Sequence, residues 1–172
     1  MYGSLAKVYQ SPGRELRELM NFNHSTTSLL TITKKAMKHI LAPALQGRHQ
    51  ISSSDALIDY VALDLREADT EILRTIYLDA KSMIIRDEEM CRGTFNNVSL
   101  YPNEVAKRAM IYSASSVVLA HNHLSEDPTP SNADINKTRR TKEALKTIDV
   151  TLHDHIIVAR RSCFSMQGEG LI

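Results

Sequence analysis

Apolar residues recur with a helical spacing in some stretches of the chain and gather into short runs rich in β-branched and aromatic residues in others. Residues 52–67 begin with serines and an acid three positions on, which is a helix-start signature. The apolar stripe of this predicted helix consists of Leu57, Tyr60, Val61 and Leu65. Residues 71–80 and 83–89 have the composition of strands, and the turn residues between them predict a β-hairpin.

The middle of the chain continues this alternation of helical and strand-like patterns. Gly93 and the pair Asn96–Asn97 carry turn signals. Residues 103–114 have a helical pattern, and we expect Asn103 to cap the helix. Residues 115–121 are a short continuous apolar run, which is typical of a strand covered on both faces.

The last part of the chain supplies another helix and another strand. The helix is predicted from Ser131 to about Lys146, and the strand over residues 149–159, before a final segment at 163–168. The order of all these elements predicts an α+β domain in which helices pack on a mixed β-sheet. We place this domain at residues 51–172.

Residues 1–50 differ from the rest and predict a short helical N-terminal extension. A helical patch lies at Glu15–Met20, and residues 29–45 have helical spacing that ends near Pro43. Turn residues separate the two patches.

Composition changes this picture little. The 172 residues are 42% hydrophobic and 24% charged, which is average for a soluble domain, and the formal net charge of +1 gives no global attraction to nucleic acid or membrane. The best local basic segment is residues 137–146. We find no apolar stretch long enough to cross a bilayer, no secretion signal and no paired cysteine motif, so we expect a cytoplasmic protein without a membrane partner.

Candidate chemistry appears where the buried strand ends. His121 and His123 are two positions apart, so in an extended strand their imidazoles point the same way. The loop that follows returns the chain so that Asp134, in the first turn of a helix, can add a carboxylate. Two nitrogens and one oxygen leave a fourth tetrahedral position open for water, as in catalytic zinc sites. Ser131 can donate its hydroxyl to a developing oxyanion.

A simpler interpretation competes with the metal site. Ser131 and Asp134 also fit a helix capping box, and a histidine at a strand end often bonds to the backbone. The combined pattern H-x-H-x7-S-x2-D, with four residue types at fixed offsets after a strand, favours the metal site.

That pattern resembles the signature of the JAMM (MPN) metalloproteases. The flanking segments "RGTFNNVSLYPNEVAKRAMIYSASSVVLAHNHLSEDPTPSNAD", "LHDHIIVA" and "GLI" closely resemble the RadC family of bacterial JAMM-like proteins, over Ser52 to Ile172. The resemblance implies a cytidine-deaminase-like architecture, hydrolysis of a peptide or isopeptide bond, and an association with DNA repair. It also implies that Zn²⁺ is held by His121, His123 and Asp134, with Ser131 as the motif serine.

In that family the general base is a glutamate that enters the first strand. This position corresponds to Glu71, and the resemblance therefore implies Glu71 as the base. Without the resemblance, Glu71 would be interpreted as a solvated acid at a strand start. Glu104 is the rival, but an acid in the first turn of a helix also suits the positive end of the helix dipole.

The chain departs from the family pattern after the second histidine. The family usually has proline and glycine where this chain has Leu124 and Glu126. We expect a looser loop, a penalty of about 1 kcal/mol if Glu126 must adopt a positive φ, and an added negative charge near the site. For His153 and His155, we expect support of the site or a core hydrogen bond rather than a second metal pair.

The alternative function is a nucleic-acid- or partner-binding accessory protein with a vestigial or structural metal site. The segment that contains Arg139 and Arg140 is the candidate contact, although such a segment is most often a solvated helix face. The family is often preceded by a helix-hairpin-helix DNA-binding module, but residues 1–50 are too short and lack a clear hairpin. Both a monomer and a homo-oligomer are compatible with the sequence.

Overall fold

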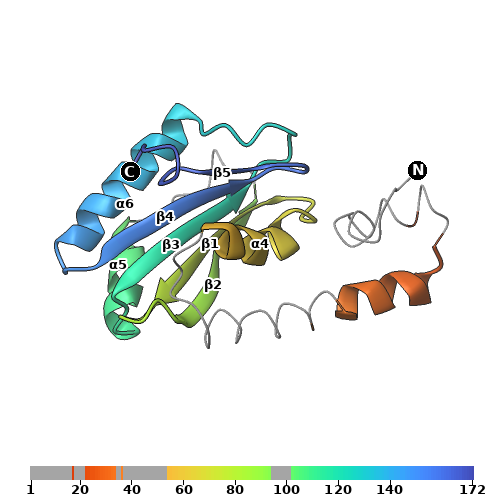
Figure 1. Cartoon of the computed structure of the whole chain (residues 1–172), viewed down its shortest axis with the longest axis horizontal. Helices are drawn as coiled ribbons and strands as arrows, with labels where there is room; N and C mark the ends of the chain where they lie inside the picture. Colours follow the sequence, from red (N-terminus) through yellow and green to blue (C-terminus); the bar gives the residue numbers. More distant parts are fainter. Residues whose placement is uncertain (1–16, 18–21, 34–35, 37–53, 94–101) are drawn as a thin grey trace.

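The computed structural model describes residues 17, 22–33, 36, 54–93 and 102–172 (Figure 1). Three helices accompany the sheet in this part of the chain: α4 (Ser54–Leu65), α5 (Pro102–Ile111) and α6 (Asn132–Lys146). The strands are β1 (Glu71–Leu78), β2 (Ile84–Gly93), β3 (Ser116–Asn122), β4 (Thr151–Val158) and β5 (Cys163–Ser165). A further short helix covers residues 24–33.

The five strands form one mixed sheet in the order β2-β1-β3-β4-β5. β1 pairs antiparallel with β2 and with β3, β3 pairs parallel with β4, and β4 pairs antiparallel with β5. The parallel pair requires a crossover connection, which α6 supplies. The predicted α+β class, the mixed sheet and the β1–β2 hairpin are therefore confirmed.

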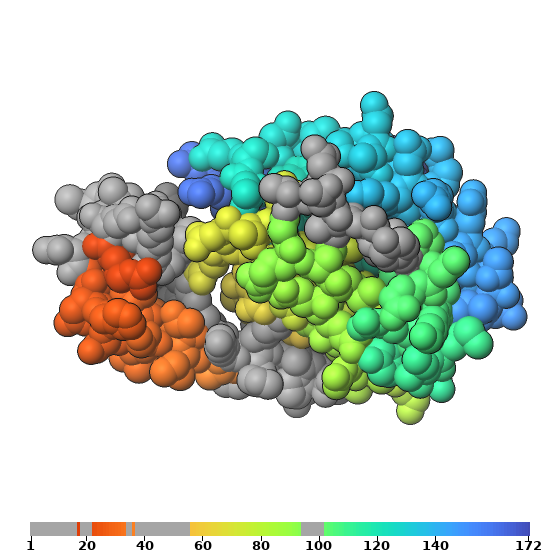
Figure 2. Space-filling view, turned by 180° about the vertical axis from the view of Figure 1, so that it is seen from behind, coloured from red at the N-terminus to blue at the C-terminus, as the bar shows by residue number. Residues whose placement is uncertain are grey.

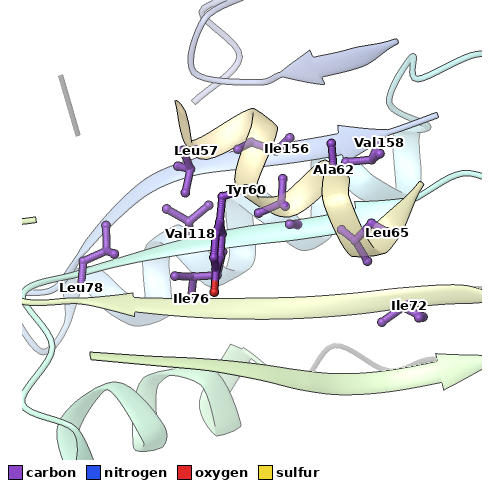
Figure 3. Close-up of a cluster of buried hydrophobic side chains, with 12 residues drawn as sticks. Leu57, Tyr60, Ala62, Leu65, Ile72, Ile76, Leu78, Val118, Ile156 and Val158 are labelled. Atoms are coloured by element: carbon purple, nitrogen blue, oxygen red, sulfur yellow. The ribbon is translucent and has the colours of Figure 1, made fainter. Parts of the chain in front are cut away.

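Two apolar layers cover the two faces of the sheet. On one face α4 packs on β1, β3 and β4, and Figure 3 shows its side chains meeting those of the strands. This layer contains Leu57, Tyr60, Val61, Ala62, Leu65, Ile72, Ile76, Leu78, Val118, Ala120, Ile156 and Val158. The stripe predicted from the sequence supplies the helical part of this core.

On the opposite face α5 and α6 form the second layer, and they lie side by side at the surface in Figure 2. Its buried residues are Leu73, Tyr77, Val105, Ala109, Ala114, Val117, Leu119, Leu145, Val150 and Leu152. β3 is buried along both faces, because its alternate side chains contribute to both layers. This matches the covered strand expected from its continuous apolar sequence.

Two predicted details are wrong. Helix α5 begins at Pro102, one residue before the expected cap Asn103, because proline at the first helical position has no N–H to satisfy and a φ already suited to a helix. Strand β2 continues to Gly93, where the sequence indicated a turn, because β1 offers backbone partners as far as Glu71. Gly93 has a φ of 139°, which favours glycine at this strand end.

Several predictions for the N-terminal region, and one predicted turn, concern residues outside the described part of the chain. The turn signal Asn96–Asn97 lies outside the described residues. So does the helical patch at Glu15–Met20, apart from Arg17, and so does most of the predicted helix beyond Thr33. Arg17 and Ala36 are helical. In the described part of the chain, no helix has the length and apolar character needed to cross a membrane.

Candidate metal centre

Three side chains converge where β3 ends and α6 begins. His121 lies on β3, His123 directly follows the strand, and Asp134 lies in the first turn of α6. The two histidine Nε2 atoms are 3.1 Å apart, and each is 3.6 Å from an oxygen of Asp134. One ligand atom from each residue falls within 4.8 Å of the others, so the three residues form a group that can hold a metal ion.

Asp134 is oriented by the capping box at the start of α6. Its Oδ2 accepts hydrogen bonds from the backbone N–H of Ser131 at 2.9 Å and from the Ser131 hydroxyl at 2.6 Å. The Ser131 oxygen in turn accepts the backbone N–H of Asp134. Such a cap contributes about 1 kcal/mol to stability. The capping interpretation and the metal interpretation are therefore compatible, because the cap fixes the carboxylate that the site needs.

The other oxygen of Asp134 is the strongest indication that a cation belongs here. Oδ1 is buried and finds no hydrogen-bond partner among the described residues. It lies 3.6 Å from His121 Nε2, which is too long for a hydrogen bond. A buried acceptor without a partner costs about 1–3 kcal/mol, more when it is charged. A cation at this position would satisfy it.

His123 is held by the loop that follows it. Its backbone N–H donates to the carbonyl of Val158 on β4, and its Nδ1 lies 3.0 Å from the carbonyl oxygen of Asp127. Because a carbonyl only accepts, Nδ1 carries the proton and Nε2 faces His121 and Asp134. Asp127 itself is fixed by the backbone N–H of Thr129 and by the hydroxyl of Ser125.

His121 is held from inside the protein. It is fully buried, and its Nδ1 lies 2.8 Å from Nε2 of His155 on β4. His155 Nδ1 lies 2.5 Å from the hydroxyl of Thr138, which donates to the backbone carbonyl of Asp134 at 2.6 Å. This places two buried histidines in series behind the ligand atoms.

The protonation of these groups follows from burial and from the carboxylate. Burial lowers the pKa of His121 well below its ordinary value, and it lowers the pKa of His155 to about 4. The Asp134 carboxylate raises the pKa of His123. Burial alone would raise the pKa of Asp134, but His123 and Ser131 more than offset it and hold the pKa well below its usual range. An anionic carboxylate therefore faces two imidazoles, and its charge favours the protonated form of His123.

The donor set fits the zinc site that the sequence predicted. Two imidazole nitrogens and one carboxylate oxygen are ligands that Zn²⁺ accepts, and three protein ligands leave one tetrahedral position open. Open positions of this kind are characteristic of catalytic rather than structural zinc sites.

The two candidate bases lie in different surroundings. Glu71 is the first residue of β1. In the antiparallel pairing of β1 with β3, Leu73 lies opposite His121. The same register, continued by two residues, places Glu71 opposite His123. Its negative charge contributes to the raised pKa of His123. Glu104 instead lies in the first turn of α5, where it forms an ion pair with Arg108 at 3.0 Å.

The altered loop does not carry the expected backbone penalty. Glu126 is not among the described residues with a positive φ, which besides glycines are Ser82, Ser113 and Asp149. Its exposed carboxylate lies 3.6 Å from Nε of Arg161, so its charge is directed to an arginine rather than to the metal ligands. The condition for the penalty, a positive φ at Glu126, is therefore not met. Leu124 is exposed, and the hydrogen bonds to Asp127 hold the loop without the family's proline.

The second histidine pair divides into two roles. His155 contacts His121 from behind, as the support of the site that we predicted, whereas His153 is outside the three-residue metal group. Asp154 accepts hydrogen bonds from Ser165 Oγ and from the backbone N–H of Gln167, which fasten β5 and the C-terminal turn to β4.

Sequence reasoning missed two residues that position the site. Asn122, between the two histidines, points to the other face, accepts the backbone N–H of Ile72 at 2.7 Å and donates to the carbonyl of Thr70. It thereby fastens the start of β1, with Glu71, to the end of β3. Thr138 was missed although it lies four residues after Asp134, on the same side of α6. That spacing was the signal that could have revealed it.

Comparisons with known proteins place the chain in one family. A family model described as the RadC-like JAB domain matches residues 51–171. A UPF0758 protein of Ruegeria pomeroyi is 38% identical over 99% of this chain and 76% of its own length. A UPF0758 protein of Rhodobacter capsulatus is 36% identical over the whole chain and 80% of its own length. With its mixed sheet and its His-His-Asp group at the end of β3, the chain belongs to the RadC-like JAB domain family.

Proposed function

We propose that this protein is a zinc-dependent hydrolase of the JAMM type that cleaves peptide or isopeptide bonds. One observation carries the proposal: two imidazole nitrogens converge with the buried Oδ1 of Asp134, which has no hydrogen-bond partner among the described residues. His121, His123 and Asp134 would hold the ion. A helix cap and a strand-end histidine would explain each residue separately, but they do not explain why the three ligand atoms lie together.

The protein's own residues divide the chemistry among them. A zinc ion, when bound, supplies Lewis-acid activation of water and of a carbonyl oxygen. Glu71 takes the proton of the attacking water and returns it to the leaving amine. Ser131 orients Asp134 in the resting site, and we propose that its hydroxyl also helps to hold the oxyanion. Burial of His121 on β3 and of Asp134 on α6 keeps bulk water from that part of the site.

The proposal predicts that the Asp134→Asn variant loses hydrolysis. The asparagine amide oxygen can still accept the backbone N–H of Ser131 in the capping box, but it lacks the negative charge that the metal requires. The zinc-loaded wild-type chain and the variant are incubated with a library of quenched fluorogenic peptides and with isopeptide-linked lysine substrates. We expect cleavage of at least one substrate class by the wild type, and a rate at the buffer background for the variant.

The matched control is Asp149→Asn, at the other end of the α6 region. Asp149 is exposed and has a φ of 55°, a conformation that asparagine tolerates, so this variant should retain the wild-type rate. Metal-dependent cleavage that survives Asp134→Asn would contradict the proposed site.

Nucleic-acid binding is the second candidate function, and the outer face of α6 favours it. Arg139, Arg140, Lys142 and Lys146 are exposed along this helix, which begins at the metal centre. Such a face can contact a phosphate backbone. An association with DNA repair would also suit this function.

Charge reversal tests this second candidate. If α6 contacts phosphates, Arg139→Glu with Arg140→Glu should reduce the slope of log affinity against log salt by about 2. The measurement is fluorescence anisotropy of labelled duplex and single-stranded DNA at several salt concentrations. The control is Arg160→Glu with Arg161→Glu, an exposed arginine pair outside α6. Equal slopes for both double variants would reject α6 as the contact.

A further inference from the structure

A chain of hydrogen bonds leads from the backbone of α6 to His121 on β3, whose other ring nitrogen faces the metal centre. Asp134 contributes twice: its backbone carbonyl accepts from Thr138, and its side chain faces His121. Between these two ends lie the Thr138 hydroxyl, His155 and His121. Thr138 and both histidines are fully or almost fully buried, so these hydrogen bonds lie away from the solvent-exposed surface.

The direction of every proton in the chain follows from the acceptor at its end. A backbone carbonyl can only accept, so the single hydroxyl proton of Thr138 is used on Asp134. The Thr138 oxygen must then accept from Nδ1–H of His155. A neutral His155 with its proton on Nδ1 has a lone pair on Nε2, and that atom accepts from Nδ1–H of His121.

From this order we infer that Thr138 and His155 set the tautomer of His121, so that its Nε2 lone pair faces His123 and Asp134 before any metal arrives. The other neutral tautomer would place a proton on Nε2, which would block the ligand atom. Thr138 and His155 are positioning residues, because they act through His121 and lie behind it. Hydrogen bonds of this kind commonly fix metal-binding histidines, and their loss costs about 10- to 100-fold in metal affinity.

The chain of hydrogen bonds also links two of the three proposed ligands, Asp134 and His121, to one another. Asp134 supplies both the carboxylate at the metal centre and the carbonyl that fixes the first proton of the chain. A movement of the first turn of α6 would therefore change the position of one ligand and the hydrogen bonding of another together. Nε2 of His121 therefore presents its lone pair to the metal centre only when α6 packs on the sheet.

This inference rests on the proposed metal centre, and Thr138→Val tests it. Valine keeps the shape of threonine but removes the hydroxyl, which leaves His155 free to adopt the other tautomer. Thr138→Ser restores the hydroxyl. Thr141→Val is the matched control, because Thr141 is buried on the same helix and its hydroxyl donates to the carbonyl of Lys137.

Two readouts are made. Zinc affinity is measured by competition with a chelator, and the imidazole tautomers of the metal-free protein are measured by long-range ¹H–¹⁵N NMR. We expect His121 to carry its proton on Nδ1 in the wild type, in Thr138→Ser and in Thr141→Val. In Thr138→Val we expect an Nε2–H population and zinc binding weakened about 10- to 100-fold.

The outcomes separate this inference from the proposed function. A wild type that binds zinc but cleaves no substrate removes the hydrolase proposal. The inference is then still supported if His121 carries its proton on Nδ1 in the wild type and if Thr138→Val binds zinc more weakly. A wild type with the proton on Nε2 of His121 overturns the inference. So does Thr138→Val with unchanged zinc affinity, or with a loss of affinity that Thr141→Val shares, since the effect would then be one of helix packing.

Discussion

A variant that carries both His121→Ala and His123→Ala is expected to contain no zinc after loading and dialysis, whereas the wild-type chain retains an equimolar amount. Removal of both imidazoles leaves Asp134 as the single member of the metal group. One carboxylate cannot replace the three protein ligands that a zinc site of this type needs. Elemental analysis of the purified proteins measures the difference directly.

Two further variants guard against misfolding as the cause. His123→Ala alone removes a partly exposed ligand and leaves the buried His121 in place, so it should fold and still lose most of the zinc. His153→Ala removes a histidine that lies outside the metal group, and it should retain the full amount. Zinc in the double variant, or none in the loaded wild type, would contradict the site.

The zinc affinity of the wild-type chain, measured by competition with a chelator, should depend on pH in a defined direction. Because Asp134 raises the pKa of His123, the metal-free site holds a proton on that imidazole below the raised pKa. Zinc must displace this proton, so its affinity falls by roughly tenfold for each pH unit below the pKa of His123 and is constant above it. A neutral His121, whose pKa is lowered by burial, adds no competing proton near neutral pH.

Glu71→Gln is expected to lower the hydrolysis rate by a factor of about 100 to 10,000 while the zinc content stays at the wild-type level. Glutamine keeps the size of the side chain at the start of β1 but cannot accept the proton of the attacking water. The zinc content should persist, because Glu71 is not part of the metal group. The rate is measured on whichever peptide or isopeptide substrate the wild type cleaves.

Glu104→Gln is the comparison for this prediction. Its carboxylate pairs with Arg108 on the surface of α5, so the change should leave both zinc content and hydrolysis close to wild type. If Glu104→Gln abolishes hydrolysis and Glu71→Gln does not, the general base has been assigned to the wrong glutamate. If neither variant changes the rate, a different residue accepts the proton.

The elements of the fold were predictable where a local pattern decided them. The stripe on α4 has the 3.6-residue period of a helix, and it forms one apolar layer as expected. The continuous apolar run of β3 indicated burial on both faces, and β3 lies in the middle of the sheet. The start of α5 and the end of β2 were placed wrongly, because Pro102 and the pairing with β1 decided them.

The sequence by itself also determined the three candidate ligands. His121 and His123 share one side of an extended strand because the strand period is two, and Ser131 and Asp134 form a capping box because they are three positions apart at a helix start. Both relations are local, since each depends on residues a few positions apart. Their presence in one pattern also led to the correct family.

Only the tertiary structure decided how those ligands are supported. His155 lies 34 positions after His121, and it reaches the ligand because β4 pairs with β3 in parallel and α6 crosses over the sheet between them. The same crossover brings Thr138 against His155, and it buries Oδ1 of Asp134 where no other described residue offers it a hydrogen bond. Burial and long-range strand pairing have no local signature, so the proton positions behind the site follow from the fold rather than from the motif.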